Sequence, residues 1–150
     1  GRPDVGVDHG LCRMKPLIYV AGPISRDPFG CVAQAAEVFQ PLRDLGWIPF
    51  LPQWSVIHQM VSPVEYDDWM AYDFDLLRHC HALLRLTGES PGADLEVAHA
   101  GTLNIPVYTA LAAVPLALSL PQGDRVASTR SQWVRPRLPS SRRRSRLPQS

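Results

Sequence analysis

The amino-acid sequence predicts one parallel α/β domain with a doubly wound sheet. Four short apolar runs have the length of buried strands, and segments long enough to form a helix lie between them. Strands that alternate with helices in this way pair in parallel through βαβ units. The four predicted strands are 17–21, 47–51, 82–86 and 105–108.

The first half of the domain is predicted to fold as strand, helix and strand. The run Leu17-Ile-Tyr-Val-Ala21 ends in Gly22-Pro23, which is typical of a strand followed by a tight loop. Apolar residues recur at helical spacing from Cys31 to Leu45, and Gly46 is a helix stop. The second strand follows directly.

The second half is predicted to begin with a loop over 52–63, followed by a helix over 64–80 that leads into the third strand. Ser90-Pro91 starts a shorter helix that reaches Leu103. A fifth strand lies near 109–113 or is absent. The predicted fold class is therefore a flavodoxin-like or Rossmann-like α/β sheet of four to five parallel strands, with helices on both faces. Ligands of such sheets bind at the carboxyl ends of the strands, so the loops after the first and third strands are the candidate site.

Charge and composition divide the chain into three parts. Residues 125–150 contain eight arginines and no acid, which leaves seven basic groups against 14 acidic ones in the preceding residues. We expect residues 14–120 to form the domain, 1–13 to be a disordered extension and 121–150 to be a disordered Arg/Ser/Pro-rich tail. The tail is either a nucleic-acid tether or a solvated segment. The acidic body favours the second reading, which makes nucleic acid an unexpected partner.

Several classes of protein are not expected. Cys12, Cys31 and Cys80 are odd in number and form no CxxC pair, so neither a disulfide framework nor a zinc site is predicted. The apolar run 110–120 is too short to span a bilayer, and the polar residues 1–13 do not resemble a signal peptide. We therefore expect a cytoplasmic protein that needs no metal or cofactor.

A carboxylate on an apolar helix face is the first functional indication. In the helix over 64–80, Asp73 falls within a stripe formed by Trp69, Tyr72, Leu77 and neighbouring residues. A buried carboxylate is costly unless it is paired or hydrogen-bonded. Asp73 therefore either caps a neighbouring element or lines a site.

Two loops supply further candidate residues. The helix start at Ser90-Pro-Gly92 offers free N–H groups to an anion, and Glu96 lies about 9 Å further along the axis. That spacing suits a sugar phosphate, although Ser90 could be only a cap and Glu96 only an exposed acid. The loop Gly22-Pro-Ile-Ser-Arg26 allows close backbone approach and offers hydroxyl and guanidinium donors, or it is only a turn that ends the strand.

Together these segments resemble the nucleoside 2-deoxyribosyltransferase-like superfamily over about residues 16–112. The superfamily includes deoxyribosyltransferases, a 2′-deoxynucleoside 5′-monophosphate N-glycosidase and cytidine monophosphate hydrolases. The chain is most similar to small members that begin with a YVAGPIS-like strand and loop, which Tyr19 to Arg26 match. His81 replaces an aspartate found in many relatives, and Ala98 replaces the glycine of the E-x-G-x-A segment.

The resemblance implies roles for individual residues. It makes Glu96 the nucleophile that attacks the sugar and Tyr19 the group that orients it. Asp73 would position or protonate the base, and Ser90 would contact a 5′-phosphate. Trp54 or Trp69 could stack on the base, although ordinary core packing is the more expected role for Trp69. The implied substrate-binding residues are Gly22, Pro23, Ile24, Ser25, Arg26, Ser90 and Gly92.

The predicted activity is cleavage of the base–sugar bond of a nucleoside or its 5′-monophosphate, by hydrolysis or by transfer to a second base. Two carboxylates suit such a reaction, which passes through an oxocarbenium-like transition state. The alternative is a nucleotide-binding or sensing module without catalysis. The presence of both Asp73 and Glu96 favours the enzyme. The resemblance also implies a homo-oligomer.

Overall fold

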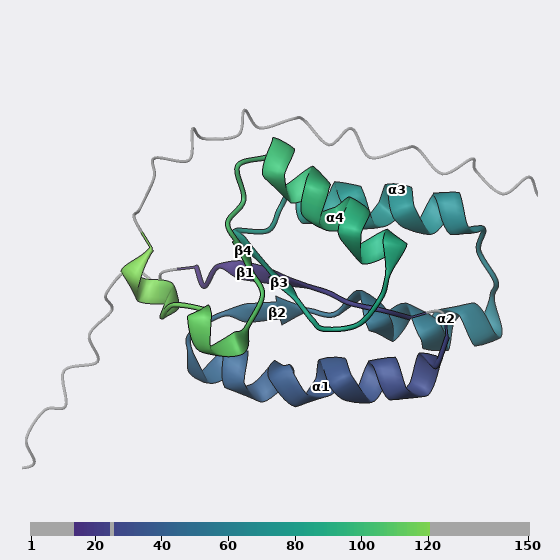
Figure 1. Cartoon of the computed structure of the whole chain (residues 1–150), viewed down its shortest axis with the longest axis horizontal. Helices are drawn as coiled ribbons and strands as arrows, with labels where there is room; N and C mark the ends of the chain where they lie inside the picture. The colour runs from purple at the N-terminus through teal and green to yellow at the C-terminus, as the bar shows by residue number, and fades with distance from the viewer. Residues whose placement is uncertain (1–13, 25, 121–150) are drawn as a thin grey trace, which may run out of the picture. The chain divides into compact units, whose positions relative to one another are not determined.

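The computed structural model describes residues 14–24 and 26–120 (Figure 1). The predictions for 1–13, for Ser25 and for 121–150 lie outside these residues. The described part contains a four-stranded sheet in the order β2-β1-β3-β4, and every pair of neighbouring strands is parallel. The predicted parallel α/β class is confirmed. The strands are β1 (Leu17–Ala21), β2 (Ile48–Phe50), β3 (Ala82–Arg85) and β4 (Val107–Tyr108).

Helices cover both faces of the sheet, as predicted. The helices are α1 (Pro28–Asp44), α2 (Ser55–Val61), α3 (Tyr66–Leu77) and α4 (Pro91–Thr102). Figure 1 shows α1 on one side of the strands and both α3 and α4 on the other.

The alternation of side chains along β1 explains the two layers. Ile18 and Val20 point to the α1 side and pack in one core cluster with Leu42. Tyr19 and Ala21 point to the opposite side and pack in a second cluster, which includes Leu77 of α3 and Ala93 and Ala100 of α4. A strand buried on both faces has to be apolar at every position, and β1 is. The placement of Tyr19 towards α4 follows from this alternation.

The strand order places a crevice at the carboxyl ends of β1 and β3. The chain passes from β1 to β2 on one side and then returns across β1 to β3 on the other. In flavodoxin-like sheets this reversal of direction opens the space in which ligands bind. The loops after β1 and β3 flank that space.

Local sequence determines where two of the helices begin. The helix predicted from Cys31 starts earlier, at Pro28, because Oδ1 of Asp27 accepts a hydrogen bond from the Gly30 N–H at 3.0 Å. The predicted cap at Ser90 is confirmed, since its Oγ accepts from the Ala93 N–H at 3.1 Å. The helix predicted over 64–80 is shorter, Tyr66–Leu77.

The prediction of a loop over 52–63 is wrong. A 3-10 turn (Pro52–Trp54) runs directly into α2, and Val56 of that helix is buried. Proline at the first position favours a helical start, and burial of Val56 anchors the short helix. Over 109–113 the structure has a 3-10 turn (Leu111–Ala113) rather than a strand, so the described sheet stays four-stranded.

Within the described ranges, no helix combines the length and the apolar character needed to cross a membrane.

Candidate active site

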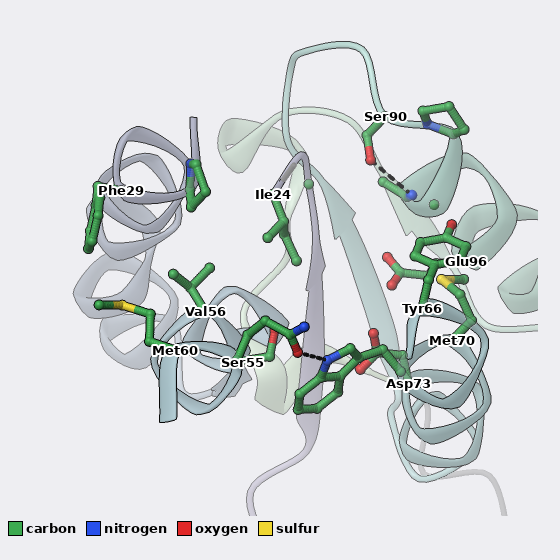
Figure 2. Close-up of a pocket in the computed structure, with 17 residues that line it drawn as sticks. Ile24, Phe29, Ser55, Val56, Met60, Tyr66, Met70, Asp73, Ser90 and Glu96 are labelled. Carbon is green, nitrogen blue, oxygen red and sulfur yellow. Dashed lines mark hydrogen bonds between the residues drawn. The ribbon is translucent and has the colours of Figure 1, made fainter. Parts of the chain in front are cut away.

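A cavity of about 760 Å³ lies at the carboxyl ends of β1 and β3. This is the position that the strand order predicts for a ligand. Figure 2 shows Asp73 and Glu96 on one side of it, Val56 and Met60 on the other, and Ile24 between them. The cavity is lined by Gly22, Ile24, Pro28, Phe29, Ser55, Val56, Gln59, Met60, Tyr66, Trp69, Met70, Asp73, Ser90, Pro91, Gly92, Ala93 and Glu96.

Glu96 is a buried acid in the second turn of α4, with 5% of its surface exposed. The Tyr19 hydroxyl donates a hydrogen bond to its Oε1 at 2.8 Å. Tyr19 is itself fully buried at the centre of β1, where its ring packs against Phe50 at 5.7 Å between centroids. The carboxyl group of Glu96 is therefore held in a fixed orientation at the cavity wall.

Asp73 reaches the cavity from α3 and is 8% exposed. It shares the inward side of the helix with Leu77, as predicted from the apolar stripe. Tyr72 was predicted on the same stripe but is 52% exposed, because it lies about 100° away around the helix from Asp73. The buried carboxylate thus lines the cavity, which is one of the two positions predicted for it.

Burial dominates the electrostatics of both acids. It raises the pKa of Glu96 to about 8; the Tyr19 hydrogen bond and Arg85 act in the opposite direction, while Asp73 adds to the rise. Burial likewise raises the pKa of Asp73 to about 6, against a lowering contribution from the Tyr19 hydroxyl. The pKa of Tyr19 is raised by burial and by both acids, so its hydroxyl stays protonated and remains a donor. Near neutral pH the two acids together hold about one proton, which belongs to the pair.

The raised pKa values predict that the protein loses stability as pH rises. A folded chain in which the pKa of an acid is raised binds a proton that the unfolded chain has released. The stabilising contribution of this proton is therefore complete below the pKa that the acid has in the unfolded chain. It is lost as the pH rises towards the raised pKa of the acid in the folded chain. For Glu96 we expect the free energy of unfolding to fall by about 1.4 kcal/mol per pH unit between pH 4.5 and about 8. Urea unfolding of the wild type and of Glu96→Gln over that range measures this slope. If the free energy of unfolding of Glu96→Gln fell as steeply with pH as that of the wild type, Glu96 would not be the group with the raised pKa.

The amino end of α4 forms a small donor site beside the acids. Ser90, Pro91 and Gly92 all line the cavity. Pro91 has no N–H, and the N–H groups of Ala93 and Asp94 already bond to Ser90. The donors of this first turn that remain for a ligand are the Ser90 hydroxyl and the Gly92 amide.

The loop after β1 contributes fewer residues than the resemblance implies. Gly22 and Ile24 line the cavity, whereas Pro23 and Arg26 are not among the lining residues. Arg26 is exposed, and its guanidinium pairs with Glu89 at 3.5 Å. A Cβ at Gly22 would come within 3.2 Å of the Gln53 and Leu86 side chains, so this glycine is needed for packing. Ser25 lies outside the described residues.

Sequence reasoning missed most of the apolar wall. Phe29 was overlooked, and Val56, Gln59 and Met60 of α2 were hidden by the loop predicted there. Trp69, named as a possible stacking residue, does line the cavity, whereas Trp54 is 45% exposed and does not.

Arg85 at the end of β3 is a second residue that the sequence analysis missed. Its guanidinium donates to Oδ1 of Asp94 at 3.0 Å, to the Gly88 carbonyl at 2.9 Å and to the Leu86 carbonyl. These bonds fix the loop that delivers Ser90 to the cavity. A lone arginine within the apolar run 82–86 was the available signal.

The described residues hold no group of three or more histidine, cysteine or acidic side chains arranged to bind a metal ion. The charged side chains that line the cavity, within the same part of the chain, are Asp73 and Glu96.

The fold and the cavity define a doubly wound α/β protein with two buried acids at the switch in strand order. No model of a known protein family matches the sequence, and no curated protein matches it. Among solved structures, the chain is similar to the 2-deoxyribosyltransferase of the psychrotolerant bacterium Bacillus psychrosaccharolyticus, with 22% identity and a TM-score of 0.46 over 61% of this chain and 69% of that one. It is also similar to the 2-desoxiribosyltransferase from Leishmania mexicana, with 18% identity and a TM-score of 0.49 over 61% of each chain. At these values the similarity concerns the arrangement of strands and helices, and function has to be argued from the cavity.

Proposed function

We propose that the protein is an N-glycosidase that cleaves the bond between base and sugar in a nucleoside or a nucleoside 5′-monophosphate. The observation that carries the proposal is the hydrogen bond from the buried Tyr19 to Glu96, which lines a cavity that Asp73 also lines. Two acids that face a common ligand space, one of which holds a proton while the other is ionised, are the arrangement that glycoside cleavage uses.

In the first step Glu96 acts as the nucleophile. Its carboxylate oxygen forms a bond to C1′ of the sugar while the bond from C1′ to the base nitrogen breaks. The electron pair of that bond goes to the base, and Asp73 donates the proton that neutralises it. Tyr19 keeps the attacking carboxylate in place through Oε1. The acid pair reacts in the form that has its proton on Asp73 and its charge on Glu96. Because burial raises the pKa of Glu96 to about 8 and that of Asp73 to about 6, this is the less populated of the two singly protonated forms before substrate binds.

In the second step the oxygen of a water molecule forms a bond to C1′, and the electron pair of the ester bond returns to the Glu96 carboxylate. Asp73, now ionised, takes a proton from that water and is ready for the next cycle. In a transferase a second base attacks C1′ instead of water, and the proton and the electron pair of the ester bond move in the same way. Both outcomes follow from one covalent intermediate, so the geometry of the acids suits hydrolysis and transfer alike.

The two ends of the cavity suit different parts of the substrate. The sugar belongs beside Glu96, and the base belongs between Asp73 and the apolar side formed by Val56, Met60 and their neighbours (Figure 2). A 5′-phosphate would take its hydrogen bonds from the Ser90 hydroxyl and the Gly92 amide at the positive end of α4. The homo-oligomer implied by the resemblance and the cytoplasmic location expected from the sequence composition remain predictions.

A substrate panel tests the proposal. The full chain is incubated with ribo- and deoxyribonucleosides and their 5′-monophosphates, with and without a free acceptor base, and released base is followed by chromatography. We expect at least one member to be cleaved. Binding of a member without cleavage would replace the enzyme by a nucleotide-binding module, and neither binding nor cleavage would reject both.

Ser90→Asp separates the two substrate classes within the same panel. Aspartate caps a helix as well as serine does, so the fold is kept, but its charge repels a phosphate. If the monophosphate is the substrate, we expect kcat/KM for it to fall by about tenfold or more while cleavage of the nucleoside is unchanged. Equal effects on both substrates would place the phosphate elsewhere.

A further inference from the structure

Gln59 and Trp69 form a hydrogen-bonded pair in the wall of the cavity. Gln59 belongs to α2 and Trp69 to α3, and both line the space. The indole Nε1–H of Trp69 donates to Oε1 of Gln59 at 2.7 Å, drawn as a dashed line in Figure 2. The pair therefore links the two helices that flank the cavity.

Gln59 is itself held by the connection between the helices. Its Oε1 also accepts from the Val64 N–H at 3.0 Å, and its Nε2 donates to the Val64 carbonyl at 3.1 Å. The side chain is exposed, so burial does not fix it. Three converging hydrogen bonds do, and they leave the amide one orientation that satisfies all of them.

Trp69 is placed relative to the reacting groups by its position on α3. Asp73 follows it by one helical turn, so the indole and the carboxylate project from the same side of the helix. The rings of His58 and Tyr72 meet the indole edge to face, at centroid distances of 5.3 and 5.9 Å. A shift of the indole would therefore change the distance between this ring of the cavity wall and the Asp73 carboxylate.

We propose that Gln59 is a positioning residue that holds the Trp69 indole as the wall against which the substrate base packs. The inference rests on the proposed function. Planar heteroaromatic bases pack favourably on an indole face, and the thioether of Met70, one residue along the same helix, lines the same space. Gln59 then governs which bases bind well and how they approach Asp73, without touching the reacting atoms.

Kinetics of Gln59→Leu test this role. The variant keeps the size of the side chain but loses all three hydrogen bonds. We expect KM for the best substrate of the panel to rise about fivefold, with kcat changed less than twofold, and the ratio of kcat/KM between purine and pyrimidine substrates to change. Gln59→Glu keeps the oxygen that accepts from Trp69 and Val64, so it should restore most of the loss. Gln40→Leu is the matched control, because the Gln40 amide bonds to Asp44 on α1, outside the cavity lining. A Gln59→Leu variant with wild-type KM and base preference would overturn the proposal.

A binding measurement separates this proposal from the glycosidase proposal. Adenine and thymine are titrated into the full chain by calorimetry and, in parallel, by ¹H–¹⁵N spectra of the indole N–H groups, with the Trp69 signal assigned from Trp69→Phe. We expect one base to shift the Trp69 signal and Gln59→Leu to weaken its binding about fivefold. If no substrate is cleaved but these effects appear, the glycosidase proposal fails and the role of Gln59 stands. A Trp69 signal that no base shifts would overturn the role of Gln59, whatever the activity.

Discussion

Glu96→Gln is expected to lower base release by about 10³-fold or more while the protein stays folded. The amide keeps the shape of the side chain and an oxygen that can accept the Tyr19 hydrogen bond. It loses the charged oxygen that has to form the bond to C1′. Base release from the best substrate, measured in single-turnover conditions, reports the loss directly.

Stability provides the check that the loss is chemical. Burial of the ionised acid is unfavourable, as its raised pKa shows, and the neutral amide removes that cost. At about pH 9 the variant should therefore unfold at a higher urea concentration than the wild type. Glu37→Gln on the exposed side of α1 is the matched control, with activity and stability unchanged. If Glu96→Gln were folded and fully active, the nucleophile would have to be another group.

The layers of the fold could be predicted because they follow from local patterns. The run Leu17–Ala21 is apolar at every position, as a strand buried on both faces must be, and Gly46 and Ser90 mark helix ends. The segment 52–63 was assigned to a loop because its proline and polar residues hide a short helix. That helix is anchored by the burial of Val56, a tertiary contact that local pattern does not reveal.

The candidate site could be predicted only in part. The apolar stripe around Asp73 indicated a buried acid, and the structure buries it. The contact between Tyr19 and Glu96 joins residues 77 positions apart. This contact depends on the register of β1 against β3 and on the rotation of α4, so no spacing in the sequence could predict it. The sequence analysis paired Tyr19 with Glu96 only because of the family resemblance. Arg26 was predicted in the site because a guanidinium binds anions. In the structure it pairs with Glu89, a contact between distant parts of the sequence that no local pattern reveals.

Asp73→Asn is expected to lower kcat by about 10²- to 10³-fold for nucleosides whose base must be protonated to depart. Asparagine fits the same space and cannot donate a carboxylic proton. The loss should depend on the leaving base, because a base that already carries a positive charge needs no proton. A guanine nucleoside methylated at N7 has such a base, and its cleavage by Asp73→Asn should fall by less than about tenfold.

The comparison of the two substrates distinguishes proton donation from a structural role of Asp73. A misplaced α3 would slow both substrates equally, whereas loss of an acid spares the one whose base departs without protonation. Asp75→Asn supplies the matched control, since Asp75 lies on the same helix but is exposed and paired with Arg78 at 3.8 Å. Equal losses for both substrates would assign Asp73 to positioning of the sugar, and the proton would then have to come from water or from another donor at the cavity. Because burial raises the pKa of Asp73 to about 6 and that of Glu96 to about 8, the pair keeps one proton between these values and loses it above about pH 8. The wild-type rate for the substrate that needs a proton should therefore decline above about pH 8, while the rate for the methylated substrate should not.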